Sequence, residues 1–115
     1  MPTVTLTPTT ADGVLDGTLE VTLVPAPASG VHRLVRWLSI HNADDMVVNL
    51  SVFIANGVDR RLVFHADLDP GDTFHLDSSD VVPLDDVRSI TAKLAGVPHS
   101  TEPDWVSGWA DQVII

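Results

Sequence analysis

The segment from Val31 to Leu94 constrains the fold most, because short apolar stretches alternate there with polar turns. Within it, apolar side chains recur at every second residue from 46 to 54 on one face, while Asn49 and Ser51 fall on the other. A period of two residues is typical of a β-strand with one buried face. The sequence therefore predicts a series of short antiparallel strands. The expected inward residues of this strand are Met46, Val48, Leu50, Val52 and Ile54.

Turn motifs separate the expected strands. Asn56-Gly57 is typical of a tight hairpin, and Asp69-Pro70-Gly71-Asp72 places proline and glycine where a β-turn accepts them. Residues 31–42 are apolar on both faces, which predicts a central strand. Arg88 shares the parity of the inward apolar residues of the strand 87–94, which indicates an edge strand. The expected strands of this region cover residues 31–42, 46–56, 60–67, 73–76 and 87–94.

The strand pattern predicts the fold class. About eight short strands are expected, and no window of the sequence shows sustained helical spacing of apolar residues. Two packed sheets are the natural way to bury such strands, so we predict an all-β antiparallel β-sandwich, either jelly-roll-like or immunoglobulin-like. Residues 13–100 form the expected sandwich domain. Residues 1–12 form an N-terminal arm or edge strand, and residues 101–115 form a C-terminal tail or final strand with a bulge at Gly108.

Composition excludes several classes of function. The 115 residues, 44% of them hydrophobic, are enough for one domain with a core. The formal net charge of −10, with a single lysine, leaves too few clustered cations for nucleic-acid binding. The sequence shows no apolar stretch of the ~20 residues that a membrane span needs and no features of a secretory signal. We therefore expect a soluble protein made in the cytoplasm, without nucleic-acid or membrane partners.

Catalytic and metal-binding patterns are missing from the sequence. It contains no cysteine, and its five histidines lack the spacing of a zinc site. Its serines lack the Gly-x-Ser-x-Gly motif, and its acidic turns lack the spacing of an EF-hand. Adjacent aspartates such as Asp44 and Asp45 would point to opposite faces of a strand. We therefore predict no enzymatic activity, no catalytic or metal-binding residues and no cofactor.

Tryptophan and arginine are the side chains most suited to protein–protein contact. Trp37 suits either the core or an interface, whereas Trp105 and Trp109 fall in a polar tail and are predicted at an interface. Arg33 and Arg36 precede Trp37 in its expected strand and can pair with the chain's own aspartates or with a partner's carboxylate. The candidate interface residues are Val4, Leu6, Arg33, Arg36, Trp37, Trp105, Trp109 and Ile114.

Five motifs between residues 31 and 95 occur together in a recognisable order. They are Val35-Arg36-Trp37-Leu38-Ser39-Ile40-His41-Asn42-Ala43-Asp44, Asn56-Gly57, Arg60-Arg61-Leu62-Val63, Asp69-Pro70-Gly71-Asp72-Thr73 and Ile90-Thr91-Ala92-Lys93. This pattern resembles small β-sandwich virion proteins of tailed bacteriophages, and the C-terminal residues 101–115 depart from it.

The resemblance implies a non-enzymatic virion structural protein, most specifically a capsid decoration (cement) protein. It implies a homo-oligomer, a trimer, with the major capsid protein or other virion proteins as partners, located in the virion after assembly in the host cytoplasm. A tail, neck or fibre-associated module is one alternative. A carbohydrate-binding β-sandwich in which Trp105 or Trp109 stacks on a sugar is the other.

Overall fold

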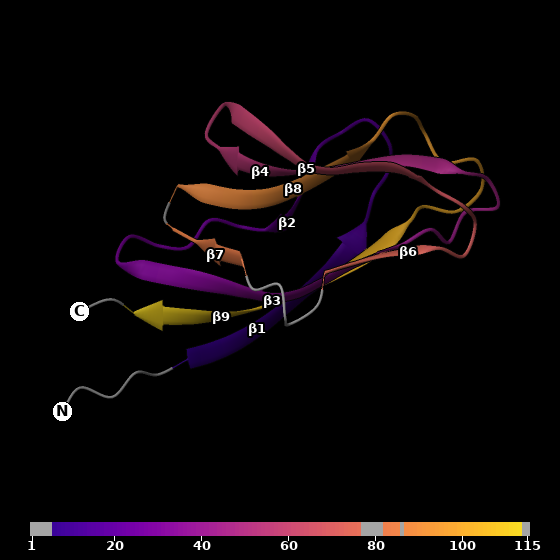
Figure 1. The fold of residues 1–115 in the computed structure, drawn as a ribbon. Helices are drawn as coiled ribbons and strands as arrows, with labels where there is room; N and C mark the ends of the chain where they lie inside the picture. Colours follow the sequence, from indigo (N-terminus) through magenta and orange to yellow (C-terminus); the bar gives the residue numbers. More distant parts are fainter. Residues whose placement is uncertain (1–5, 77–81, 86, 114–115) are drawn as a thin grey trace.

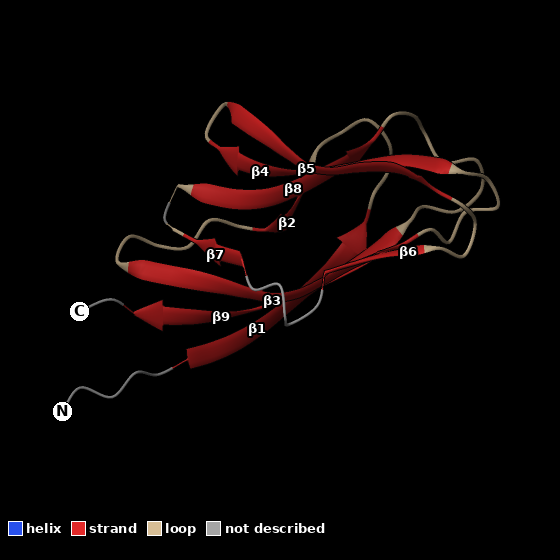
Figure 2. Cartoon of the chain, in the orientation of Figure 1, coloured by secondary structure: helices blue, strands red, loops and turns tan. Residues whose placement is uncertain are grey.

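The computed structural model describes residues 6–76, 82–85 and 87–113. These residues form nine β-strands in two antiparallel sheets that pack face to face (Figure 1, Figure 2). The predicted all-β sandwich is therefore confirmed. The described part of the chain contains no helix with the length and apolar character that a membrane crossing requires. The strands are β1 (Leu6–Val14), β2 (Val21–Val24), β3 (Val31–His41), β4 (Val48–Asn56), β5 (Asp59–Leu68), β6 (Thr73–Leu76), β7 (Val82–Leu84), β8 (Arg88–Leu94) and β9 (Asp104–Val113).

The strand order identifies the sandwich as a jelly roll. One sheet has the order β1-β9-β3-β6, with β7 also paired to β3, and the other has the order β2-β8-β4-β5. Apart from the β4–β5 hairpin and the β6–β7 connection, every connection crosses to the other sheet, and the first strand pairs with the last. Two Greek keys wound together produce this order. Of the two predicted alternatives, the jelly roll is therefore correct.

Each sheet buries one apolar face in a shared core. On β4 the alternating residues Val48, Leu50 and Val52 are all buried, as the period of two predicts. Full burial of a valine or leucine side chain contributes about 1.5–3 kcal/mol, so this stripe is a main source of stability. The other buried hydrophobic residues include Leu15, Leu23, Val24, Val35, Leu38, Ile40, Leu68, Leu84, Ile90, Ala92 and Leu94.

The molecule is elongated, with extents of 54 × 27 × 19 Å, and its two ends differ. At the end that we call the hairpin end, Gly57 and Val58 join β4 to β5. Gly57 has a φ of 61°, which the first central position of a type II′ hairpin turn requires. At the opposite end, the loop end, the connections 15–20, 42–47, 69–72 and 95–103 gather (Figure 1).

Three local predictions have different outcomes. The central position predicted for residues 31–42 is confirmed, because β3 lies between β9 and the β6 and β7 strands. The edge position inferred from Arg88 is wrong: β8 lies between β2 and β4, and Arg88 is its first residue, at the hairpin end. Met46 is predicted to face inward, but it is 55% exposed in the loop before β4, which begins at Val48.

Candidate interaction surfaces

A bulge in β3 presents Arg36 and Trp37 on the outer face of the five-stranded sheet. Val35 pairs with Trp109 and Trp37 pairs with Gly108, so Arg36 is the extra residue. The bulge predicted at Gly108 therefore lies on the strand opposite, and β1 pairs with β9 without interruption through that position. Val35, the residue before the bulge, is buried on the inward side. The extra residue interrupts the alternation, so Arg36 and Trp37 both lie on the outer face.

Trp37 rests on a glycine of the neighbouring strand. A Cβ atom at position 108 would overlap the Trp37 indole, so Gly108 provides the space that the half-buried ring occupies. Beside the ring is an open groove of about 440 Å³, which Thr10 and Arg36 also line. Two of the predicted interface residues, Arg36 and Trp37, are therefore adjacent on one sheet face.

Arg33 faces the opposite way, toward the sandwich interior near the hairpin end. Its Nε donates to Asp111 Oδ1 at 2.8 Å and its second terminal nitrogen donates to Oδ2 at 3.0 Å. Its remaining terminal nitrogen donates to the Pro25 carbonyl at 2.7 Å. The guanidinium also stacks over the Trp109 ring, 4.9 Å from its centroid. Of the two predicted pairings for Arg33, the structure thus contains the one with the chain's own aspartate.

Trp105 and Trp109 belong to the hydrophobic core, and each exposes only 6% of its surface. They alternate with Ser107 on the inward side of β9. Trp105 packs on β1, where a Cβ added to Gly13 would lie 3.0 Å from the indole. The polar sequence around these tryptophans indicated an exposed tail, but it belongs to a strand of the sheet. The interface role predicted for them therefore has no exposed side chain to support it.

The remaining candidate interface residues lie at the chain ends. Val4 and Ile114 fall outside the described residues. Leu6 begins β1 and its backbone pairs with Gln112 of β9. Interface roles for these three residues stay predictions.

Asn42 joins the connections of the loop end. Its side chain is 0% exposed. Its amide nitrogen donates to the carbonyls of Met46 at 3.0 Å and Leu68 at 2.9 Å, and its Oδ1 accepts from the backbone N–H of Asp44 at 2.9 Å. Its own N–H donates to the Asp72 carbonyl at 2.9 Å. One buried residue thereby holds the β3–β4 connection against the β5–β6 connection.

Asp44 ties the β3–β4 connection to the β8–β9 connection. Its carboxylate accepts from the backbone N–H groups of Asp45, His99, Ser100 and Thr101 at 2.9, 2.8, 2.9 and 3.2 Å. Burial raises the pKa of Asp44, but these backbone donors together lower it more, so the pKa lies well below its ordinary value of 3.8. Asp44 is therefore a structural carboxylate that stays ionised.

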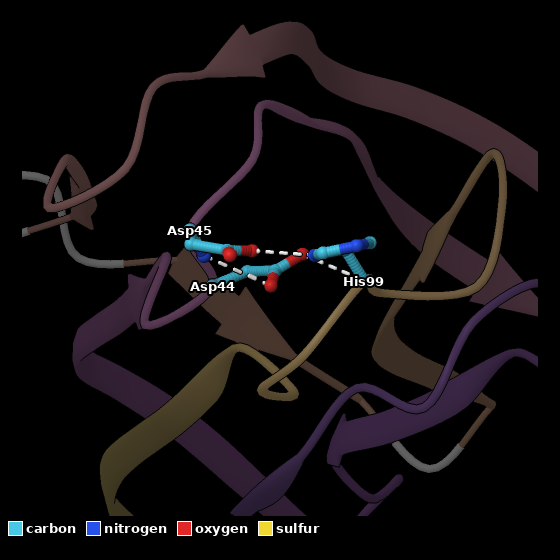
Figure 3. A group of neighbouring side chains, drawn as sticks. All are labelled: Asp44, Asp45 and His99. Carbon is cyan, nitrogen blue, oxygen red and sulfur yellow. Dashed lines mark hydrogen bonds and ion pairs between the residues drawn. The ribbon is translucent and has the colours of Figure 1, made fainter.

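Asp45 and His99 point toward one another beside Asp44 (Figure 3). His99 Nδ1 lies 2.9 Å from Asp45 Oδ1, and this hydrogen bond and the charge of Asp45 raise the pKa of His99. Ligand-type atoms of the three residues lie within 4.8 Å of one another, so the group could approach a cation. Both oxygens of Asp44 already accept protein donors, however, which gives the cluster a structural use. No sequence spacing indicates this group, because Asp45 and His99 are 54 residues apart.

No known protein family matches the sequence, and no curated protein sequence matches it. Among solved structures, a chain of Bacillus endospore appendages, which form disulfide-linked pili, matches with a TM-score of 0.58 and 10% identity, over 98% of this chain and 90% of that one. This likeness extends over the whole sandwich and shows a shared fold.

Two viral structures also match, at lower similarity. A pentameric capsid protein from metagenomic phage sequences has a TM-score of 0.45 and 16% identity, over 90% of this chain and 61% of its own. A chain of infectious bursal disease virus, Gx strain, has a TM-score of 0.43 and 15% identity, over 95% of this chain and 32% of its own. The protein is a jelly-roll sandwich, and its structural neighbours are pilus, capsid and virus proteins.

Proposed function

We propose that this chain is a non-enzymatic structural subunit of a virion, and more specifically a decoration protein on the capsid of a tailed phage. It acts as a homotrimer that contacts the major capsid protein. The observation that carries this proposal is the outer face of the five-stranded sheet, where the β3 bulge holds Arg36 and Trp37 side by side. A tryptophan beside an arginine is typical of an interface hot spot.

The fold supports the same role. Jelly rolls recur in capsid proteins, and the sequence motifs between residues 31 and 95 resemble those of phage virion proteins. The two tryptophans of β9 are buried in the core, and Asp44 is buried at the loop end. A ligand-binding or hydrolytic site that used these side chains would need them exposed. The carbohydrate-binding alternative depended on stacking by Trp105 or Trp109, and since both rings are buried we do not propose it.

A pilus-type appendage subunit is a second candidate, which the whole-chain likeness to the Bacillus appendage protein favours. Disulfide links, which join those pili, are not available to this sequence, because it contains no cysteine. Assembly of such an appendage would therefore rest on non-covalent contacts.

Quantitative mass spectrometry of purified virions from the phage that encodes the chain tests the proposal. About one copy per capsid subunit, as a trimer at each local threefold, is the expected result. A few copies per particle would instead indicate the tail, neck or fibre alternative, and absence from particles would refute the virion role.

A variant pair connects the test to the proposed surface. Truncating a hot-spot tryptophan costs about 2 kcal/mol or more, which corresponds to roughly 30-fold weaker binding. Trp37→Ala should therefore lower the copy number in particles. Leu62→Ala, which changes an exposed residue on β5 of the other sheet, should leave it unchanged. Equal incorporation of both variants would remove Trp37 from the proposed interface.

A further inference from the structure

The cationic side chains of this acidic protein are concentrated at the hairpin end. The chain has six lysines and arginines in total. Three of them, Arg60, Arg61 and Arg88, line a single pocket of about 560 Å³ beside the β4–β5 hairpin. Half of the lysines and arginines therefore line one pocket on a molecule whose net charge is −10.

The register of the four-stranded sheet places Arg61 and Arg88 on its inward side. Arg61 pairs with Ile54 and Arg88 pairs with Asn56, and both partners continue the inward parity of β4. Neither arginine forms an ion pair with a residue that the structure describes. The acidic residue that lines the same pocket is Asp59. The two arginines thus place positive charge in the pocket at the hairpin end of the sandwich.

Arg60 shows how an arginine at this end binds a carboxylate. Its Nε and a terminal nitrogen donate to the two carboxylate oxygens of Glu20 at 2.6 and 2.9 Å. The hydrogen bond from Arg60 is the main cause that lowers the pKa of Glu20, and Thr91 adds a second hydrogen bond at 2.6 Å. This two-point contact is the geometry in which arginine recognises carboxylates.

Several exposed carboxylates lie at the loop end, where β1 ends beside the start of β9. Val14 pairs with Asp104, and the N–H of Leu15 donates to the Pro103 carbonyl at 2.8 Å, so the two connections lie side by side. The acidic patch defined by this juxtaposition consists of the exposed residues Asp12, Asp16, Glu102 and Asp104. None of these four carboxylates makes a hydrogen bond or ion pair with any residue in the described ranges.

We propose that the pocket lined by Arg61 and Arg88 binds the acidic patch of a second copy of this chain, which joins the copies head to tail. The contact is heterologous, since it uses a different surface on each partner, and it closes into a ring or continues as a chain. Exposed apolar residues flank both surfaces: Val58 is 95% exposed at the hairpin tip, and Val97 is 81% exposed at the loop end. Their burial adds to the affinity.

Two copies that each carry a net charge of −10 repel one another, but salt screens this repulsion over most of their length. The Debye length is about 8 Å at physiological ionic strength, whereas the molecule is 54 Å long. An arginine pocket therefore interacts with the acidic patch that it touches and only weakly with the rest of the neighbouring copy. At about 1 M salt the Debye length falls to about 3 Å, and the attraction across the contact weakens.

Sedimentation velocity of the purified chain over a range of concentrations tests the inference. At about 0.15 M salt we expect association that increases with concentration, and at about 1 M salt we expect it to weaken. Arg88→Glu should weaken association at least tenfold. Lys93→Glu makes the same charge change on the exposed side of β8, away from the pocket, and should not. A monomer at every concentration, or equal effects of the two variants, would overturn the inference.

A charge swap separates this contact from any other. Two double variants are compared: Arg61→Glu/Arg88→Glu in the pocket, and Glu102→Arg/Asp104→Arg in the acidic patch. Each variant alone should fail to associate, because its two surfaces then carry the same charge. An equimolar mixture should restore association, because the acidic pocket of one variant faces the basic patch of the other. Circular dichroism establishes that the variants are folded, and the exposed Glu102 and Asp104 provide a test that does not depend on the pocket variants folding. A mixture that stays monomeric would overturn the head-to-tail contact.

This inference deepens the proposed structural role and rests on it for its biological setting. Different experimental results would refute the virion role and the head-to-tail contact. A chain that is abundant in virions but monomeric in solution keeps the virion role, and loses the homotrimer together with the head-to-tail contact. A chain that associates as described but is absent from particles keeps the contact and loses the virion role.

Discussion

Replacing Asn42 with alanine should destabilise the protein far more than its place in a polar turn indicates. The substitution removes three side-chain hydrogen bonds, to the Met46 and Leu68 carbonyls and from the Asp44 N–H, at a site with 0% exposure. A net contribution of about 1 kcal/mol for each bond predicts a loss of about 3 kcal/mol. With an unfolding entropy of about 2.1 cal/mol/K per residue over 115 residues, Tm should fall by roughly 12 °C.

Thermal unfolding followed by circular dichroism measures this loss, and urea unfolding gives an independent free energy. Asn49→Ala is the matched control, since Asn49 makes one exposed hydrogen bond to Asp67 at 2.8 Å. We expect the control to change stability by less than about 0.5 kcal/mol. If Asn42→Ala lowered Tm no more than Asn49→Ala, the loop end would not be held together by this buried side chain.

Three further expectations concern single sites. Gly108→Ala should displace the Trp37 indole and increase acrylamide quenching of tryptophan fluorescence, whereas Gly96→Ala, which adds its Cβ in open space, should not. Ser107→Ala removes a buried 2.7 Å hydrogen bond to the Leu23 carbonyl and should cost about 1 kcal/mol in urea unfolding. The lowered pKa of Asp44 stabilises the fold above its ordinary value of 3.8, and this effect is lost as the pH falls through the lowered pKa. A pH series of urea midpoints should therefore decline in acid, and Asp44→Asn should flatten that decline; an unchanged slope would contradict the role of this carboxylate.

The strand pattern of β4 and β5 was predictable because its determinants are local. Alternation from Val48 to Val52 specifies the buried face, and Gly57 provides the positive φ that the turn requires. The position of Trp105 and Trp109 was not predictable in the same way. Polar neighbours on β9 made that segment resemble an exposed tail, yet Asp111 is paired by Arg33 and Ser107 by the Leu23 carbonyl, 78 and 84 residues away.

The candidate surfaces also combine residues that the sequence indicates with arrangements that only the structure shows. Arg36 and Trp37 were identified as interface residues from composition and neighbourhood, but only the pairing of β3 with β9 showed that a bulge turns both outward over Gly108. The bond network of Asp44 and the pocket that contains Arg61 and Arg88 had no signal in the sequence, because their members come from connections and strands far apart in the chain.

The local residue pattern predicts an all-β chain, the places of most strands and turns, and the apolar face of a regularly alternating strand such as β4. These properties follow from steric and solvation preferences that act over a few residues. The jelly-roll order, the burial of the β9 tryptophans and the pocket lined by Arg61 and Arg88 arise only when the two sheets pack together. A period of two specifies which side chains are buried but not which strand lies alongside, so every property that depends on a neighbour from a distant strand is settled only when the two sheets pack.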